Sequence, residues 1–240
     1  PSIRSAFDMA LYDLAAKAAN MPLYQFLGGE ASTDGSHREI RTDLTIGMQK
    51  TVKQTLSLAA RIVAAGFDAI KMKVGRPGLA DVEHVKAVRE LVGPDIAIKM
   101  DSNQGWDYPT AVANINAMKP LNLQYSEQPL AVWDFQNLAR LRDKVELPIC
   151  ADESVFDHHD ALKLINQGAA DYLNIKLGKS GGIHTGLKIN AIAEAAGCKC
   201  MIGCFAESRL ALSAAAHVAI AKPNIVFLDL DSAYDFVTDP

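Results

Sequence analysis

Short β-type runs alternate with longer helical runs along most of the chain, beginning near residue 43. In the longer runs, such as 51–66, 80–93 and 182–197, apolar residues recur at the spacing of a helix that is buried along one face. Several of these runs end in Gly or are followed by Pro, as helix C-termini often are. The β-type runs between them are 43–47, 69–74, 96–101, 123–128, 148–153, 172–177, 199–203 and 225–231.

Eight strands separated by seven helices predict an α/β fold, a TIM-type (β/α)7β barrel. An open doubly wound sheet is the alternative, but it rarely needs eight such regular units. The first strand is also not followed by a Gly-rich dinucleotide motif. A helical lead over residues 3–19 precedes the first strand, and we expect it to cover the side of the barrel where the eighth strand has no helix of its own.

Composition narrows the class of protein. The chain has 240 residues, of which 49% are hydrophobic and 22% charged, as in ordinary globular proteins. A net charge of -4 argues against a nucleic-acid partner, and no apolar run approaches the roughly 20 residues that span a bilayer. The N-terminal residues lack the apolar core of a signal peptide, so we expect a cytoplasmic protein without a membrane partner. We also expect a homo-oligomer. The spacing of Cys198, Cys200 and Cys204 fits no usual zinc pattern, so these residues and Cys150 are interpreted as buried thiols.

Carboxylates close three consecutive strands. Asp101, Glu127 and Asp152 lie 26 and 25 residues apart, at the strand ends where TIM barrels carry their chemistry. One such acid could simply cap the next helix. Three at one level repel one another unless a cation lies among them, and all-oxygen ligands favour a hard ion. The sequence therefore predicts a Mg²⁺ site.

Lysines flank these acids. Lys71 and Lys73 stand two apart on the second strand and face the same side, and Lys176 ends the sixth strand. Strands two and six lie across the mouth of an eight-stranded barrel, so a bound substrate would have an amine on each face. This suits removal of a proton from one face of a carbon and its return to the other. A lysine acts as a base only when neutral, and both burial and a neighbouring ammonium lower its pKa.

The ordered motifs KMK, MDSNQGW, SEQP, ADES, NIKLGKSGG and DLD resemble the enolase superfamily, in its muconate-lactonizing-enzyme subgroup, over essentially the whole chain. Members use Lys or His bases with Mg²⁺ and an ene-diolate intermediate, so this chemistry is implied by the resemblance. The resemblance implies that the Mg²⁺ ligands are Asp101, Glu127 and Asp152.

The same resemblance assigns roles to the residues around the metal. Lys73 and Lys176 would be the two acid/base groups. Lys71 would lie behind Lys73 and lower its pKa. Asn103 and Glu153 would belong to the surrounding polar shell.

The closing DLD, with Asp229 and Asp231, is similar to that of dipeptide epimerases, in which the pair binds the α-ammonium group of the substrate. Two carboxylates on one face of a strand end suit a cation, although a surface acidic turn would look the same. The motifs NQGW and GCFAES also resemble this group. The implied reaction is Mg²⁺-dependent epimerisation of a dipeptide at its C-terminal residue by two-base 1,1-proton transfer.

Superfamily members normally carry an α+β capping domain, which is missing from this sequence on our interpretation. We therefore divide the chain into a lead-in helix and loop (1–42), the catalytic barrel (43–231) and a tail toward the capping domain (232–240). Side-chain preference for the dipeptide is unreadable without that domain.

Other functions stay open. Within the subgroup they are dehydration of the o-succinylbenzoate synthase type, cycloisomerisation and N-acylamino acid racemisation, whose substrates give Asp229 and Asp231 no ammonium group to bind. Outside it, Lys176 could form a Schiff base in a barrel lyase, or the barrel could bind its ligand without turnover.

Five further residues are interpreted as structural. Lys179 is expected in a solvated loop, and His158 and His159 at a helix start. His217 is expected to pack on a helix, and Lys99 to form an internal ion pair with Asp101 on the same face of its strand.

Overall fold

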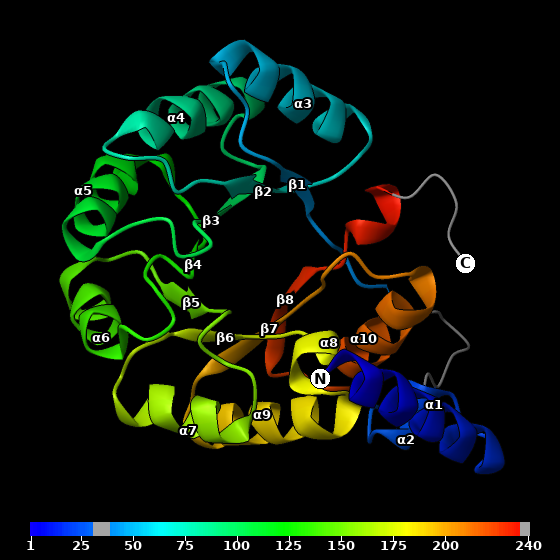
Figure 1. Ribbon diagram of the computed structural model, residues 1–240. Helices are drawn as coiled ribbons and strands as arrows, with labels where there is room; N and C mark the ends of the chain where they lie inside the picture. Colours follow the sequence, from blue (N-terminus) through cyan, green and yellow to red (C-terminus); the bar gives the residue numbers. More distant parts are fainter. Residues whose placement is uncertain (31–38, 236–240) are drawn as a thin grey trace. The chain divides into compact units, whose positions relative to one another are not determined.

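The computed structural model describes residues 1–30 and 39–235 (Figure 1). All eight predicted strands are present, each within or equal to its predicted run. Their bounds are β1 Leu44–Ile46, β2 Ala69–Lys73, β3 Ala97–Asp101, β4 Ser126–Glu127, β5 Ile149–Ala151, β6 Tyr172–Ile175, β7 Lys199–Gly203 and β8 Ile225–Asp229.

The strands follow the sequence order β1 to β8 in one sheet, and the pairs from β1 to β5, like β7 with β8, are parallel. Helices connect consecutive strands, which confirms the predicted (β/α)7β topology of the TIM type. Parallel order places the C-terminal ends of neighbouring strands at the same edge of the sheet. Registers pair Lys73 with Asp101 and Asp101 with Glu127.

Local sequence explains where the helices begin. Thr51 starts the helix after β1 with a capping box, in which its side chain accepts the Gln54 N–H and Gln54 bonds back to Thr51. Asp107 and Asp134 cap the helices after β3 and β4 in a similar way. The bounds are α1 Ser2–Ala18, α2 Leu23–Phe26, α3 Val52–Ala64, α4 Ala80–Val92, α5 Tyr108–Met118, η1 Lys119–Leu121, α6 Phe135–Lys144, α7 His158–Asn166, α8 Leu177–Ser180, α9 Ile183–Ala195, α10 Arg209–Ala221 and η2 Ser232–Asp235.

The chain forms two compact units. The first comprises residues 43–154 and 163–172 and holds β1–β5, with α3, α4, α5 and α6 along their outer side (Figure 1). Alternate residues of its strands are buried apolar side chains, such as Ile70 and Met72 on β2. Lys99 does form an internal ion pair, but its partner is Asp43 at 2.7 Å and not the predicted Asp101. The segment before β1 supplies this acid, which the spacing within β3 could not reveal.

The second unit comprises residues 1–42, 155–162 and 173–240, in which α1 and α2 pack with α8, α9 and α10. His217 of α10 packs as predicted, with its ring stacked on Tyr24 at 5.9 Å between centroids. The His217 Nδ1 also accepts the Tyr24 N–H at 3.1 Å. Among the described helices, none is both long and apolar enough to cross a membrane.

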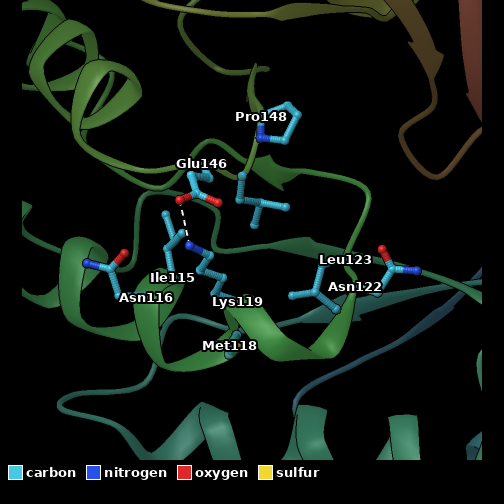
Figure 2. Close-up of a pocket in the computed structure, with 9 residues that line it drawn as sticks. Ile115, Asn116, Met118, Lys119, Asn122, Leu123, Glu146 and Pro148 are labelled. Carbon is cyan, nitrogen blue, oxygen red and sulfur yellow. Dashed lines mark hydrogen bonds and ion pairs between the residues drawn. The ribbon is translucent and has the colours of Figure 1, made fainter.

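A cavity of about 230 Å³ opens in the first unit where the segments leading into β4 and β5 pass η1 (Figure 2). Figure 2 shows Lys119 and Glu146 paired across it. The Lys119 Nζ lies 2.5 Å from Glu146 Oε1. Both side chains are more than half exposed, and ion pairs of this kind contribute little stability. Because the cavity adjoins the N-terminal ends of the strands, it is not where the predicted chemistry lies.

Candidate functional site

Three buried carboxylates follow one another along the C-terminal ends of β3, β4 and β5. Asp101 and Glu127 are the last residues of neighbouring strands, are direct register partners and have no solvent exposure. Asp152 follows the last residue of β5 and is 2% exposed. Burial of three acids is costly unless cations accompany them, so their environment decides what the cluster can do.

Two lysines of β2 supply positive charge. The Lys71 Nζ lies 3.2 Å from Asp101 Oδ2 and 3.1 Å from Glu127 Oε2, and its side chain is 2% exposed. The Lys73 Nζ lies 2.6 Å from the same Oδ2 of Asp101, and its side chain is 29% exposed. The two lysines therefore differ in kind: Lys71 is sealed among the acids, and Lys73 reaches solvent, where a substrate can meet it.

The donor set fits a divalent cation. At their formal charges, three carboxylates against two ammonium groups leave one net negative charge. Carboxylate oxygens are the ligands that Mg²⁺ prefers, and Mg²⁺ usually keeps several waters beside one or two protein carboxylates. Asp101, Glu127 and Asp152 stay the predicted ligands of such an ion, and the structure brings two of them, Asp101 and Glu127, onto the same Lys71 Nζ.

A polar shell surrounds the acids in the loop after β3. The Asn103 N–H donates to Asp101 Oδ1 at 2.9 Å, and its side chain accepts from Lys73 Nζ at 2.7 Å. Its Nδ2 donates to Glu153 Oε1 at 3.1 Å. The loop lies close to the one after β2, since a Cβ on Gly105 would stand 2.6 Å from the Cα of Gly75. The structure thus brings Asn103 and Glu153 next to the cluster, where the sequence predicted a polar shell.

Lys176 lies in the other unit, as the residue between β6 and α8. Its side chain is buried, with Nζ 5.0 Å from the centre of the Phe205 ring. A Cβ on Gly203 would meet its Cε at 3.1 Å, so glycine at the end of β7 makes room for this lysine. Near it lies Glu207, a half-buried acid. Burial raises the pKa of Glu207, and a hydrogen bond from the Phe205 backbone and the Lys176 charge partly lower it. Glu207 belongs to the motif GCFAES.

The prediction for Lys179 is wrong. The residue is not in a solvated loop but in the short helix α8, where its side chain is 4% exposed and its Nζ donates to the Asn174 carbonyl at 3.0 Å. The glycines that follow it made this stretch look like a loop. His158 begins α7 as predicted.

The two acids of DLD occupy different environments. Asp229 ends β8 opposite Gly203 and is 3% exposed, which rules out a surface turn for this residue. Asp231 lies beyond the strand, half-buried, and the Cys204 thiol approaches its Oδ1 at 3.9 Å. Burial and the charge of Asp229 raise the pKa of Cys204 to about 11. The four cysteines form no disulfide, and the prediction of buried thiols is confirmed for Cys150, Cys200 and Cys204 but is wrong for Cys198, which is only half-buried.

Comparison with known proteins agrees with this arrangement. Residues 54–239 match the family model "Enolase C-terminal domain-like", and residues 2–28 match "Mandelate racemase / muconate lactonizing enzyme, N-terminal domain". All of the chain aligns with 66% of the hydrophobic dipeptide epimerase of Enterococcus faecalis at 43% identity. It also aligns in full with 63% of the N-succinyl-L-Arg/Lys racemase of Bacillus cereus at 35% identity.

A solved structure extends this result to three dimensions. The dipeptide epimerase of Cytophaga hutchinsonii, in complex with Mg and the dipeptide D-Ala-L-Val, superposes with a TM-score of 0.93 at 41% identity. The match covers 99% of this chain and 63% of that one. The chain thus spans about two thirds of the length of these relatives. It belongs to the mandelate racemase/muconate lactonizing enzyme group of the enolase superfamily.

Proposed function

We propose that the protein is a Mg²⁺-dependent dipeptide epimerase that inverts the α-carbon of the C-terminal residue. The observation that carries the proposal is the buried cluster in which Lys71 and Lys73 share one oxygen of Asp101. A structural ion pair needs one amine. A second amine that reaches solvent beside the same carboxylate suits a group that exchanges protons with a ligand.

In this proposal Lys73 and Lys176 are the two acid/base residues, which would act on opposite faces of the substrate's α-carbon. The neutral lysine takes the α-proton, the electron pair of the C–H bond moves into the adjacent carboxylate to give an ene-diolate, and the other, protonated lysine returns a proton on the opposite face. Mg²⁺ held by Asp101, Glu127 and Asp152 would supply Lewis acidity at that carboxylate. Lys71 is proposed to act on Lys73 through the Asp101 carboxylate oxygen that the two lysines share.

Asp229 and Asp231 are proposed to bind the α-ammonium group of the dipeptide, because two carboxylates near one strand end favour a cation. N-acylamino acid racemisation is the second candidate, since the N-succinyl-L-Arg/Lys racemase is also a relative. An N-succinyl group has no ammonium at this position, so the buried Asp229 favours the dipeptide.

The experiment is ¹H NMR of a dipeptide library in D₂O with Mg²⁺, using the full-length protein. Loss of the α-proton signal at the C-terminal residue supports the proposal. Exchange of N-succinylamino acids, with every dipeptide left protonated, would instead establish the second candidate. A Schiff-base lyase would be revealed by borohydride trapping of a carbonyl substrate on Lys176. The cytoplasmic location, the homo-oligomeric state and the boundaries 1–42, 43–231 and 232–240 stay predictions.

A further inference from the structure

Gln128 is an uncharged residue completely buried between two of the proposed metal ligands. It directly follows Glu127, and its side chain has no solvent exposure. Its φ of +33° lies in the left-handed region that residues other than glycine rarely adopt. Its backbone ties three strand ends together, since its N–H donates to Cys150 O and its carbonyl accepts the Gln104 N–H, both at 2.8 Å.

The side chain uses its hydrogen-bonding capacity fully. Its Oε1 accepts two backbone N–H groups, from Asp152 at 2.9 Å and from Ser154 at 3.1 Å. Its Nε2 donates to Ser154 Oγ at 2.8 Å and to the Leu130 carbonyl at 2.9 Å. An amide side chain has two donors and two acceptor lone pairs, so all four are engaged.

These bonds act on one feature, the backbone at the end of β5. The Asp152 N–H belongs to the residue whose carboxylate is a proposed ligand. Gln128, which accepts this N–H, directly follows Glu127, another proposed ligand. A buried backbone N–H left without its acceptor is costly, so the side-chain Oε1 of Gln128 fixes the Asp152 backbone relative to Glu127.

We infer that Gln128 is a positioning residue, which sets the separation of the Glu127 and Asp152 carboxylates to that required by a small divalent cation. The inference rests on the proposed metal site. Mg²⁺ demands near-ideal octahedral geometry, whereas Ca²⁺ accepts flexible arrangements with longer bonds. A loosened spacing should therefore harm Mg²⁺ binding more than Ca²⁺ binding.

The test is calorimetric titration of the full-length protein with Mg²⁺ and with Ca²⁺, without substrate. Gln128→Met keeps the length of the side chain and removes all four hydrogen bonds. We expect its Mg²⁺ affinity to fall about 10- to 100-fold, as when other residues that orient metal ligands are changed. Its Ca²⁺ affinity should fall less, so that the ratio of the two affinities drops. The matched control is Gln124→Met, earlier on the same segment, which should leave both affinities unchanged.

Two outcomes would overturn the inference. One is a folded Gln128→Met protein with unaltered affinities, and the other is an equal loss for both ions, which indicates a general structural role. If Gln128→Met fails to fold, Ser154→Ala decides, because it removes one bond to Gln128 and should lower the affinity ratio by a smaller factor. An unchanged ratio there would also refute the inference.

Failure of the proposed function is separable from this result. Wild-type protein that binds Mg²⁺ but exchanges no dipeptide α-proton would refute the epimerase proposal and leave Gln128 as a positioning residue. Wild-type protein that binds no Mg²⁺ would refute both.

Discussion

Replacement of Lys71 by Met tests how the buried carboxylates are held. The substitution keeps the length of the side chain and removes an ammonium that lies 3.2 Å from Asp101 and 3.1 Å from Glu127. At an effective dielectric constant of about 20, each contact is worth about 5 kcal/mol of attraction. Breaking a buried pair by removing one partner typically costs about 3–5 kcal/mol. We expect the free energy of unfolding to fall by about that amount when no divalent cation is present.

Added Mg²⁺ should recover part of this loss, because the ion takes over as counter-charge for the same acids. A ligand that binds only the folded state stabilises it by about 2.7 kcal/mol at a hundredfold excess over Kd. The gain should be larger for Lys71→Met than for wild type. The assay is urea unfolding followed by circular dichroism, once with EDTA and once with Mg²⁺.

Lys99→Met is the matched control. Lys99 is the register partner of Lys71 on β3, is similarly buried and pairs with Asp43 at 2.7 Å. This variant should be destabilised comparably, but its gain from Mg²⁺ should equal that of wild type. If Lys71→Met unfolds within about 1 kcal/mol of wild type in EDTA, or gains no more from Mg²⁺ than Lys99→Met, the account of the cluster is refuted.

Three further predictions address the second unit. Burial raises the pKa of the Cys204 thiol to about 11, whereas Cys198 is not buried. Iodoacetamide at pH 8 should therefore label Cys198 well before Cys204, as followed by mass spectrometry. Faster labelling of Cys204 would contradict its burial. Burial lowers the pKa of His217, and the Asp13 charge partly opposes this. As the pH drops below about 6.5, the unfolded state therefore takes up the proton first, and the free energy of unfolding should fall. His217→Gln should show a shallower fall with pH, and an unaltered slope would refute this. Gly203→Ala would place a Cβ 2.8 Å from Asn174 Oδ1 and 3.1 Å from Lys176 Cε, so it should lower kcat at least tenfold. The control Gly47→Ala, whose Cβ would have no atom nearer than 3.9 Å, should leave kcat unchanged. Equal kcat values for the two variants would show that Gly203 does not confine Lys176.

The sequence predicted what depends on periodicity. All eight strands, the long helices and the succession of acids could be predicted because apolar spacing and strand-end position are local properties of the chain. What it missed depends on contacts between distant segments. Lys99 pairs with Asp43, which lies in the segment just before β1. Lys179 is buried because the short helix α8 places its Nζ at the Asn174 carbonyl.

The candidate site shows the same division. The acids and lysines could be chosen by residue type and register, but sequence could not reveal that Lys71 and Lys73 share one oxygen of Asp101. Nor could it distinguish Gln128 from any other polar residue beside a ligand, because its role lies in four hydrogen bonds to residues two to 26 positions away.

Two lysines are proposed to work on opposite faces of one carbon. The direct measurement is ¹H NMR in D₂O of Lys73→Ala and Lys176→Ala, each given both epimers of an accepted dipeptide. Neither variant should epimerise, because each lacks one of the two bases. Each should exchange the α-proton of one epimer only, and the two variants should choose opposite epimers. Full epimerisation by either variant, or exchange of the same epimer by both, would contradict the two-base account.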